Sequence, residues 1–271
     1  MKAATHSRGG FCTLKGMSNR DDVFIKRAQV PAQAGYEAAG LAWLADAVPG
    51  SVVPVLSVGG TELTIERLAV ARATPRAAHE FGAALRRLHQ AGAPAFGAPP
   101  AGWAGRTYIG SIEQPCEPTD NWGEFYAEQR VRPFARAAAR VGNLAAPALA
   151  LVERACDAIA ARDWDVAPAR LHGDLWSGNL IFTPAPGGGV RGVMIDPAAH
   201  GGHPYTDLGM LALFDAPLLD EIFGGYGAPE DIWEQLPLHQ LHPLAVHAQT
   251  HGPAYAQPLT RAAHATLELL R

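Results

Sequence analysis

The most informative part of the chain is the stretch LHGDLWSGNLIF, residues 171–182. Asp174 follows a His-Gly pair, Asn179 comes five residues later, and the apolar run after it predicts a short strand. A loop of this kind suits phosphoryl transfer, in which a carboxylate accepts the proton of an attacking hydroxyl and an amide oxygen binds the magnesium ion on the nucleotide phosphates. We therefore expect Asp174 to be the catalytic base and Asn179 to be a metal ligand.

A second segment, VMIDP at residues 193–197, supplies another carboxylate. Its hydrophobic residues predict a strand that delivers Asp196 at its end, and Mg²⁺ prefers hard oxygen ligands together with water and phosphate oxygens. Taken alone, Asp174, Asn179 and Asp196 could each be an ordinary turn or pre-proline residue. Their combination at these spacings favours a kinase that uses ATP and Mg²⁺ to phosphorylate a small substrate with a hydroxyl group.

The N-terminal region offers candidate groups for binding the nucleotide. Lys26 ends a short β-rich run, and Glu37 lies on the predicted helix that follows, at residues 37–48. The order strand, lysine, helix, glutamate favours an ion pair that holds a phosphate-binding lysine over a solvated lysine at a sheet edge. Because glycine lets backbone N–H groups approach phosphates closely, Gly9 and Gly10 are candidates for a phosphate-binding turn.

A boundary between two lobes is predicted where strands give way to alanine-rich helix. Residues 52–58 and 62–68 are typical of two strands joined by a turn at Gly59 and Gly60, and Thr74–Pro75 has the composition of a helix start. We therefore divide the chain into a nucleotide-binding lobe, residues 1–70, and a catalytic and substrate-binding lobe, residues 71–271.

Glu66 and Leu68 lie where the two lobes are expected to join, and there the backbone would pair with adenine. Further along, an irregular connection is predicted at residues 94–121, followed by helices at residues 122–141 and 147–162. A strand hairpin is predicted at residues 180–195, and the chain is expected to be mostly helical from residue 204 onward. The predicted fold class is therefore α+β, a two-lobed protein-kinase-like fold with a small β-rich N-lobe and a larger, mostly helical C-lobe.

Composition limits the classes of protein that need to be considered. The chain has 271 residues and a formal net charge of -4, which gives no basic face for a nucleic-acid partner. No apolar stretch reaches about 18 residues, so we expect no membrane span, and the start lacks the apolar core of a signal peptide. The three cysteines are too few for a disulfide framework, which favours reduced thiols in the cytoplasm. We expect a monomer or a weak homodimer.

Trp176, two residues after the predicted base, is the candidate contact for the acceptor substrate. A Trp face suits a sugar ring or a cationic amine, although Trp is also often a core residue. We assign His172, on the other side of the base, to the substrate site as well. His247 and His251 are four residues apart on a predicted helix, a spacing that can bind a metal. Because no cysteine or carboxylate cluster accompanies them, a surface or substrate-lining role is favoured.

The motif HGDLWSGN, residues 172–179, resembles the catalytic loop of the fructosamine kinase (ketosamine-3-kinase) family, whose protein-kinase-like fold is shared with aminoglycoside and choline phosphotransferases. The Trp-Ser-Gly sequence that precedes Asn179 in this motif is typical of fructosamine kinases. The resemblance covers nearly the whole chain. It continues at residues 195–198, Gly202–His203, Asp207–Leu208, Phe96–Gly97, residues 108–111, Asn121–Trp122, Phe125–Tyr126, Arg130, Arg132 and in the tail from Leu238 to Gly252.

The resemblance implies ATP- and Mg²⁺-dependent phosphorylation of the sugar O3 of ketosamines, such as ribulosamines and fructosamines on amines or protein lysines. The unstable 3-phosphate then decomposes and frees the amine, so the activity repairs glycation. The resemblance gives the predicted base, metal ligands and lysine–glutamate pair the same roles as above. It also places Trp176 on the sugar and residues 9–10 in the phosphate loop. One departure is Pro204–Tyr205, which stands where the family usually has an Arg-Glu pair.

Two other functions stay open from the sequence alone. A kinase of the aminoglycoside type would need carboxylates around a polycationic substrate, but the C-terminal helices carry mostly His, Gln and apolar residues, with Asp231 and Glu234 as the nearest exceptions. A catalytically weak nucleotide-binding module would suit the short N-terminal loop. The intact set of Asp174, Asn179 and Asp196 argues against it.

Overall fold

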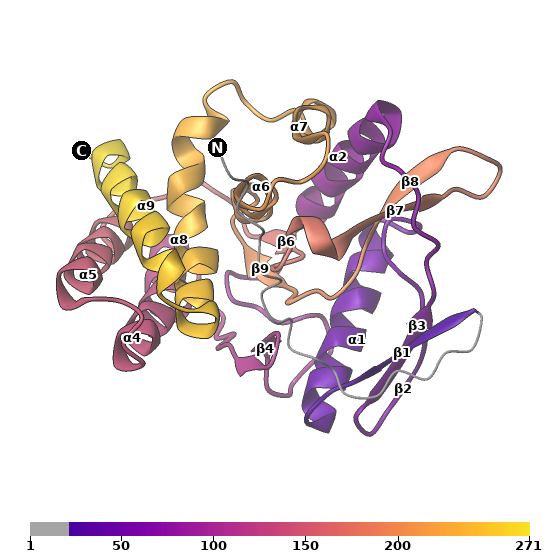
Figure 1. Ribbon diagram of the computed structural model, residues 1–271, viewed down its shortest axis with the longest axis horizontal. Coiled ribbons are helices and arrows are strands. Elements are labelled where there is room, and N and C mark those ends of the chain that lie inside the picture. Colours follow the sequence, from indigo (N-terminus) through magenta and orange to yellow (C-terminus); the bar gives the residue numbers. More distant parts are fainter. Residues whose placement is uncertain (1–21) are drawn as a thin grey trace, which may run out of the picture.

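Three antiparallel strands and a long helix form the first part of the described chain (Figure 1). The structure is a computed structural model, and it describes residues 22–271. The strands β1 Val23–Arg27, β2 Val55–Gly59 and β3 Glu62–Glu66 lie in the order β1-β3-β2. The predicted hairpin is confirmed, and Gly60 at φ 56° provides the left-handed conformation of its turn.

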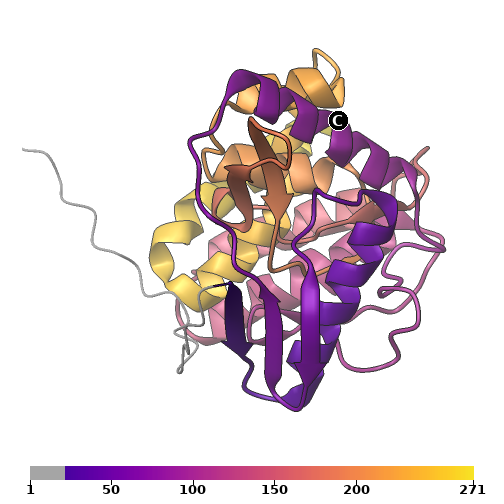
Figure 2. The ribbon, with the colours of Figure 1, turned by 90° about the vertical axis from the view of Figure 1, so that its right-hand side faces the viewer.

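Helix α1, Pro31–Ala47, packs on this sheet and brings Glu37 toward it. It begins earlier than the sequence predicts, at Pro31 instead of Glu37. The Gln33 side chain accepts a hydrogen bond from the Gln29 backbone N–H at 2.9 Å. This bond satisfies a backbone donor that lies just before the first turn of the helix. Figure 2 looks onto the three strands, with α1 beside them.

An extended linker, residues 67–74, leads into helix α2, Pro75–Gln90. The predicted start of this helix is confirmed, because the Thr74 hydroxyl accepts a hydrogen bond from the Ala77 amide at 3.2 Å. The apolar stripe of Phe81, Leu85 and Leu88 is buried as expected. Within the linker, the Ala71 amide donates to the carbonyl of Phe182 at 2.7 Å and ties the linker to the strand after the catalytic loop.

Two short strand pairs frame the catalytic region. Its elements are β6 Ala169–Leu171, the 3₁₀ turn η2 Ser177–Asn179, β7 Leu180–Pro184, β8 Val190–Met194 and β9 His200–Gly202. β6 pairs with β9, and β7 pairs with β8, so the predicted hairpin is confirmed. Met194 also exchanges backbone hydrogen bonds with Ser51 and Val53, at 2.9 and 3.0 Å, which joins this hairpin to the N-terminal part.

Helices make up most of the remaining chain. They are α3 Trp122–Phe125, α4 Arg132–Arg140, α5 Ala146–Ala160, α6 Tyr205–Leu213, α7 Leu219–Tyr226, α8 Ile232–His251, the 3₁₀ turn η3 Pro253–Tyr255 and α9 Ala256–Leu269. The connection predicted to be irregular, residues 94–121, contains the small hairpin of β4 Tyr108–Ile109 and β5 Ile112–Glu113. None of the helices within residues 22–271 is both long and apolar enough to cross a membrane.

The helix predicted at residues 122–141 contains a π-helical turn, η1 Tyr126–Val131, between α3 and α4. A π turn widens the helix locally and often serves a particular side chain. Here it carries Arg130, which is almost fully buried and whose guanidinium donates to the carbonyl of Pro115 at 2.5 Å and lies 4.5 Å from the centre of the Phe125 ring. The turn therefore anchors the preceding loop to the helix.

Two hydrophobic cores lie on either side of the catalytic region. The first combines side chains of α1 and β3 with those of α2, β7, β8 and α7, and it includes Leu175. The second is built from α3, η1, α4, α5, α8 and α9, and it includes Ala198. The segment from Leu175 to Ala198 thus spans both cores, which fixes its backbone. The boundary at residues 70 and 71 stays a prediction.

Candidate active site

The backbone of the catalytic loop is held by a buried carboxylate on α6. Asp207 accepts hydrogen bonds from the amides of His172 and Gly173, each at 2.9 Å, and from His89 Nε2 on α2 at 3.0 Å. Burial favours the neutral acid, but the hydrogen bond and charge of His89 outweigh it, and the pKa of Asp207 lies below its ordinary value. His89 in turn contacts the Tyr226 hydroxyl at 2.9 Å.

His89 and the anchoring role of Asp207 were missed by the sequence analysis. Asp207 appeared there only as part of a resembling segment. The hydrogen bond between His89 and Asp207 joins residues far apart in the chain, and a lone His on a helix gives no local signal of such a partner.

His172 is fully buried, and both of its ring nitrogens are engaged. Nε2 lies 2.8 Å from the carbonyl of Ile195, to which it donates, and Nδ1 accepts a hydrogen bond from the Asp174 amide at 3.2 Å. Burial lowers the pKa of His172, so the ring is neutral. This environment favours a role in positioning Asp174 over the substrate contact predicted for His172.

Asp174 and Asn179 lie against each other in the catalytic loop. Asn179 Nδ2 donates to the Asp174 carbonyl at 2.8 Å, to Asp174 Oδ2 at 3.2 Å and to the Asp196 carbonyl at 3.4 Å. Burial, reinforced by the charge of Asp196, raises the pKa of Asp174 well above its ordinary value, and the hydrogen bond from Asn179 opposes this shift. A carboxylate with a raised pKa is a stronger proton acceptor, which suits a general base.

Lys26 bridges two carboxylates on the nucleotide side of the loop. Its Nζ lies 2.5 Å from Glu37 Oε1 and 2.7 Å from Asp196 Oδ1. Burial opposes the charge on the lysine, but the two carboxylates prevail and raise its pKa, so Lys26 is protonated. The predicted ion pair is thus present, and Asp196 extends it. Asp196 has φ 55°, a left-handed conformation that costs energy in a residue other than glycine and is typical of functional sites.

Asn179 and Asp196 together fit a magnesium ion that also binds phosphate. The Asn179 amide oxygen accepts no hydrogen bond from residues 22–271, although the amide nitrogen is fully used. The Asp196 side chain is 39% exposed and offers a second hard oxygen donor. Within that range, no group of three or more His, Cys, Asp or Glu side chains could hold a metal by itself. Such a site therefore suits an ion that arrives with phosphate oxygens.

The predicted adenine-binding residues lie at the entry to the linker. Glu66 ends β3, and Leu68 follows in the extended segment, where it packs against the first core. The linker also borders a cavity of about 420 Å³, which is lined by residues 70–73, residues 180–182, Pro217 and Leu218. Gly9 and Gly10, the predicted phosphate-binding turn, lie outside the described residues.

The other side of the base is lined by rings. The Trp176 ring covers Gly178 so closely that a Cβ at that position would overlap with it. The rings of Trp176 and Phe214, which follows α6, meet in a T-shaped arrangement with their centres 6.3 Å apart. The centres of the Phe214 and His247 rings are 4.7 Å apart, and His247 lies on α8. Trp176 is half-buried and stands two residues after Asp174 in the chain.

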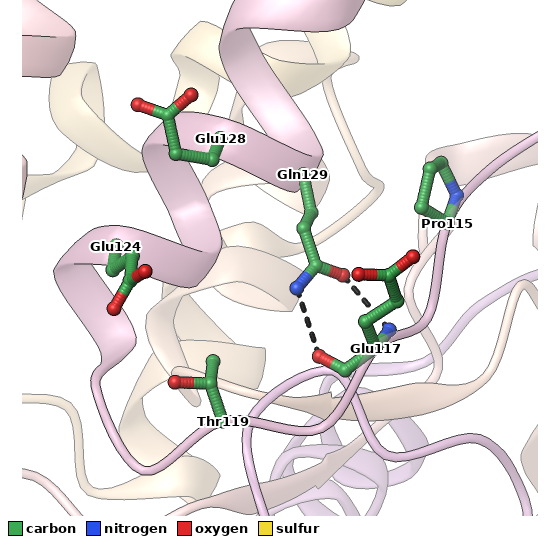
Figure 3. A pocket seen from close by; sticks show the side chains of 6 residues that line it. All are labelled: Pro115, Glu117, Thr119, Glu124, Glu128 and Gln129. Atoms are coloured by element: carbon green, nitrogen blue, oxygen red, sulfur yellow. Dashed lines mark hydrogen bonds between the residues drawn. The ribbon is translucent and has the colours of Figure 1, made fainter.

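A separate acidic cavity of about 330 Å³ lies between the loop at residues 115–119 and the helix from α3 to η1 (Figure 3). Gln129 bridges the backbone of Glu117, with its amide donating to the carbonyl at 2.8 Å and accepting from the amide N–H at 2.9 Å. The cavity is lined by Pro115, Glu117, Thr119, Glu124, Glu128 and Gln129, and it shares no residue with the catalytic loop.

The family model for fructosamine kinases matches residues 9–268, which confirms the resemblance seen in the sequence. A probable ketoamine kinase of Synechocystis sp. is 33% identical over 226 residues, covering 81% of this chain and 69% of its own length. The ketosamine-3-kinase of mouse is 29% identical, with 79% and 77% covered.

Solved structures confirm the predicted fold. A candidate fructosamine-3-kinase from Thermobifida fusca superimposes with a TM-score of 0.81 at 39% identity, covering 91% of this chain and 85% of that one. The aminoglycoside phosphotransferase APH(2″)-IIa, solved with gentamicin, gives a TM-score of 0.57 at 12% identity, covering 92% and 85%. The second likeness shows the two-lobed kinase-like fold alone.

Proposed function

The chain belongs to the fructosamine kinase family of phosphotransferases, and from this premise we propose that it transfers the γ-phosphoryl group of ATP to O3 of the sugar in a ketosamine. The substrates are ribulosamines or fructosamines on amines or protein lysines. The similarity to the mouse ketosamine-3-kinase supports the choice of O3. Decomposition of the 3-phosphate would free the amine, which makes the reaction a deglycation step.

The observation that carries this proposal is the convergence of five polar side chains from four separate segments. Lys26 on β1, Glu37 on α1, Asp196 after β8 and the pair Asp174 and Asn179 in the catalytic loop are linked by contacts of 2.5 to 3.4 Å. Phosphoryl transfer needs a positioned base, a cation for the phosphates and metal ligands, and this set offers one of each kind.

Each residue has a distinct part in the proposed reaction. Asp174 accepts the proton of the attacking hydroxyl, and its raised pKa makes that transfer more favourable. Lys26, held by Glu37, donates to the nucleotide phosphates when they displace its contact with Asp196. Asn179 and Asp196 would hold the Mg²⁺ ion, which supplies positive charge that neutralises the phosphate oxygens.

The nucleotide base is expected to lie at the linker beside Glu66 and Leu68, where the Glu66 amide itself donates to the Pro54 carbonyl at 3.0 Å. Ile181, which follows Asn179 on β7 and is half-buried at the linker cavity, offers an apolar surface nearby. Within residues 22–271, the thiols of Cys116 and Cys156 form no disulfide, which suits a reducing cytoplasm.

Coupled ADP release tests the proposal directly. The protein is incubated with Mg-ATP and, in parallel, with ribulosyl-lysine, fructosyl-lysine and an aminoglycoside. We expect turnover with at least one ketosamine and none with the aminoglycoside. Turnover with the aminoglycoside alone would assign the site to a different acceptor. Nucleotide binding without turnover of any of the three would point to a module that has lost catalysis.

A further inference from the structure

Helix α1 is held by the C-terminal part of the chain as well as by the sheet on which it packs. The Tyr36 hydroxyl donates to the Ala199 carbonyl at 2.8 Å, and Ala199 comes three residues after Asp196. A Cβ at Gly40 would lie 3.2 Å from the Ala199 side chain, so the helix backbone lies directly against the same segment. Tyr36 and Gly40 are four residues apart and share one face of the helix. This face therefore docks on the segment after Asp196.

The loop before β4 covers the N-terminal half of α1. The Trp103 ring is so close to Gly35 that a Cβ at Gly35 would lie 2.8 Å from it, and the centres of the Trp103 and Tyr36 rings are 6.0 Å apart. The Trp103 indole N–H donates to the Arg106 carbonyl at 3.1 Å, which fixes the ring in its own loop. The Tyr36 ring is therefore restrained by a second segment, in addition to its hydrogen bond with Ala199.

The Tyr36 hydroxyl is suited to a lasting hydrogen bond. The Tyr36 side chain is only 2% exposed, so little water competes for its hydroxyl. Burial raises the pKa of Tyr36 well above its ordinary value, and the hydroxyl therefore stays protonated. Because a carbonyl oxygen can only accept, the hydroxyl proton is directed at Ala199. The bond thus ties α1 to the segment that carries Asp196.

Glu37 is the next residue on the helix, and its side chain points about 100° around the helix axis from that of Tyr36. Its Oε1 lies 2.5 Å from Lys26 Nζ, and Asp196 Oδ1 lies 2.7 Å from the same nitrogen. A rotation or a slide of α1 would move Tyr36 and Glu37 together, because adjacent residues of a helix share one rigid backbone. The Tyr36 bond therefore sets the distance between the two carboxylates that flank Lys26.

A purely structural role can be separated from this one by comparison with Tyr126. The Tyr126 hydroxyl is also buried and donates to a backbone carbonyl, that of Leu238, at 3.0 Å. Tyr126 lies in η1, among the helices of the second core. The two tyrosines thus make the same kind of bond, but Tyr36 stands next to Glu37 on the nucleotide side.

We propose, on the basis of the proposed function, that Tyr36 is a positioning residue for nucleotide binding. Its hydrogen bond to Ala199 holds α1 at the place where Glu37 contacts Lys26, so that Lys26 is already aligned when the nucleotide phosphates bind. Tyr36 acts through Glu37 and takes no part in the chemistry. Preorganisation of this kind strengthens binding, because the cost of ordering the site is removed in advance.

The test replaces Tyr36 by Phe, which removes the hydroxyl and keeps the ring. Calorimetric titration gives the Kd for Mg-ATP, and initial rates give KM for each substrate. The net contribution of one hydrogen bond corresponds to a factor of about two to ten in an equilibrium constant. The Kd for Mg-ATP and KM for ATP should therefore rise by about two- to tenfold in Tyr36→Phe, whereas KM for the ketosamine should stay within about twofold.

A double-mutant cycle shows whether Tyr36 acts through Glu37. In Glu37→Gln the carboxylate is already lost, so adding Tyr36→Phe should change the Kd for Mg-ATP by less than about twofold. Equal effects of Tyr36→Phe in the wild type and in Glu37→Gln would overturn the proposed positioning role.

Tyr126→Phe is the matched control, because it removes a buried hydroxyl with the same kind of partner. It should lower the unfolding temperature about as much as Tyr36→Phe does and leave both ATP constants unchanged. Unchanged ATP constants in Tyr36→Phe, or an equal rise in Tyr126→Phe, would overturn the proposal. A wild type that binds Mg-ATP but phosphorylates no ketosamine would overturn the proposed function alone, because the Kd for Mg-ATP still decides the role of Tyr36.

Discussion

The two sides of Asp174 differ in the chemistry of the side chains that line them. On the nucleotide side, Lys26, Glu37 and Asp196 are joined by ion pairs of 2.5 and 2.7 Å, and Asp196 has a strained backbone. On the acceptor side, the ring of Phe214 contacts the rings of Trp176 and His247, and no ion pair joins these three. Fixed charge lies where phosphate charge must be neutralised, and uncharged surface lies where a sugar must be held. The first side is suited to the chemistry, and the second is suited to choosing the substrate.

The largest effect is expected at the residue between the two sides. Asp174→Ala removes the proton acceptor, so the rate of transfer should fall by about 10²–10⁴-fold, the range typical of general-base catalysis. Nucleotide affinity and the unfolding temperature should change little. Coupled ADP release and calorimetric titration with ATP measure the two quantities.

Asp163→Ala is the control for this variant, because Asp163 is an exposed carboxylate after α5. It should behave as the wild type. An Asp174→Ala protein that retained more than a few per cent of the wild-type rate would remove Asp174 from the role of base.

The next effect concerns the charged side alone. Lys26→Met removes the cation that binds phosphate and leaves Glu37 and Asp196 facing each other, so kcat/KM for ATP should fall by about 10²-fold, as for loss of one electrostatic contact in a transition state. Glu37→Gln should cost less, because Asp196 still positions Lys26. The comparison fails if either change affects KM for the sugar as strongly as KM for ATP.

The acceptor side is tested by Trp176→Ala. Loss of the ring should raise KM for the ketosamine by up to about tenfold, the upper value for one aromatic contact, and leave KM for ATP nearly unchanged. Initial rates at varied concentrations of each substrate give both constants. If both constants rose equally, Trp176 would be a packing residue that supports the loop through Gly178 and Phe214.

The smallest effect per site concerns the second core, on which the acceptor side rests. His200 and His203 are buried there, and burial lowers the pKa of each from 6.5 to about 3. His239 and His242 are shifted in the same direction. The unfolded chain takes up protons that the folded chain excludes, so stability should fall as the pH drops from about 6.5 toward 3. Each buried histidine contributes at most about 1.4 kcal/mol per pH unit.

His239→Phe should reduce this pH dependence. Within residues 22–271, His239 Nδ1 is buried without a hydrogen-bond partner. Its ring packs on Trp122 and His203, so a Phe keeps the packing and removes one titrating group. Urea unfolding at pH 7.5 and pH 5.5 gives the free energy of unfolding at each pH. An unchanged difference between the two values would show that His239 does not contribute to acid sensitivity.

The sequence predicted the features that depend on neighbouring residues. The strand before Lys26, the turn at Gly59–Gly60 and the helix start at Thr74 follow from local spacing, and the structure has all of them. The pairing of Lys26 with Glu37 was also predictable, because a strand and the next helix commonly pack together.

Other features depend on contacts between distant segments and could not be predicted. The earlier start of α1 is a local exception, because the capping side chain of Gln33 lies outside the predicted range. The anchoring of the loop by Asp207 and His89, and the bridge from Lys26 to Asp196, join residues far apart in sequence. The ring contacts that join Trp176, Phe214, His247 and Tyr255 have the same character, because these residues come from the catalytic loop, the segment just after α6, α8 and η3.

The most direct test of the account follows the phosphoryl group itself. Phosphorus NMR with proton correlation is recorded while the protein acts on Mg-ATP and ribulosyl-lysine. The γ-phosphate signal of ATP should decline as a phosphomonoester coupled to H3 of the sugar appears, followed by free lysine. Neither change should occur with Asp174→Ala. Inorganic phosphate formed without any sugar phosphomonoester, or a phosphomonoester on a different hydroxyl, would contradict this expectation.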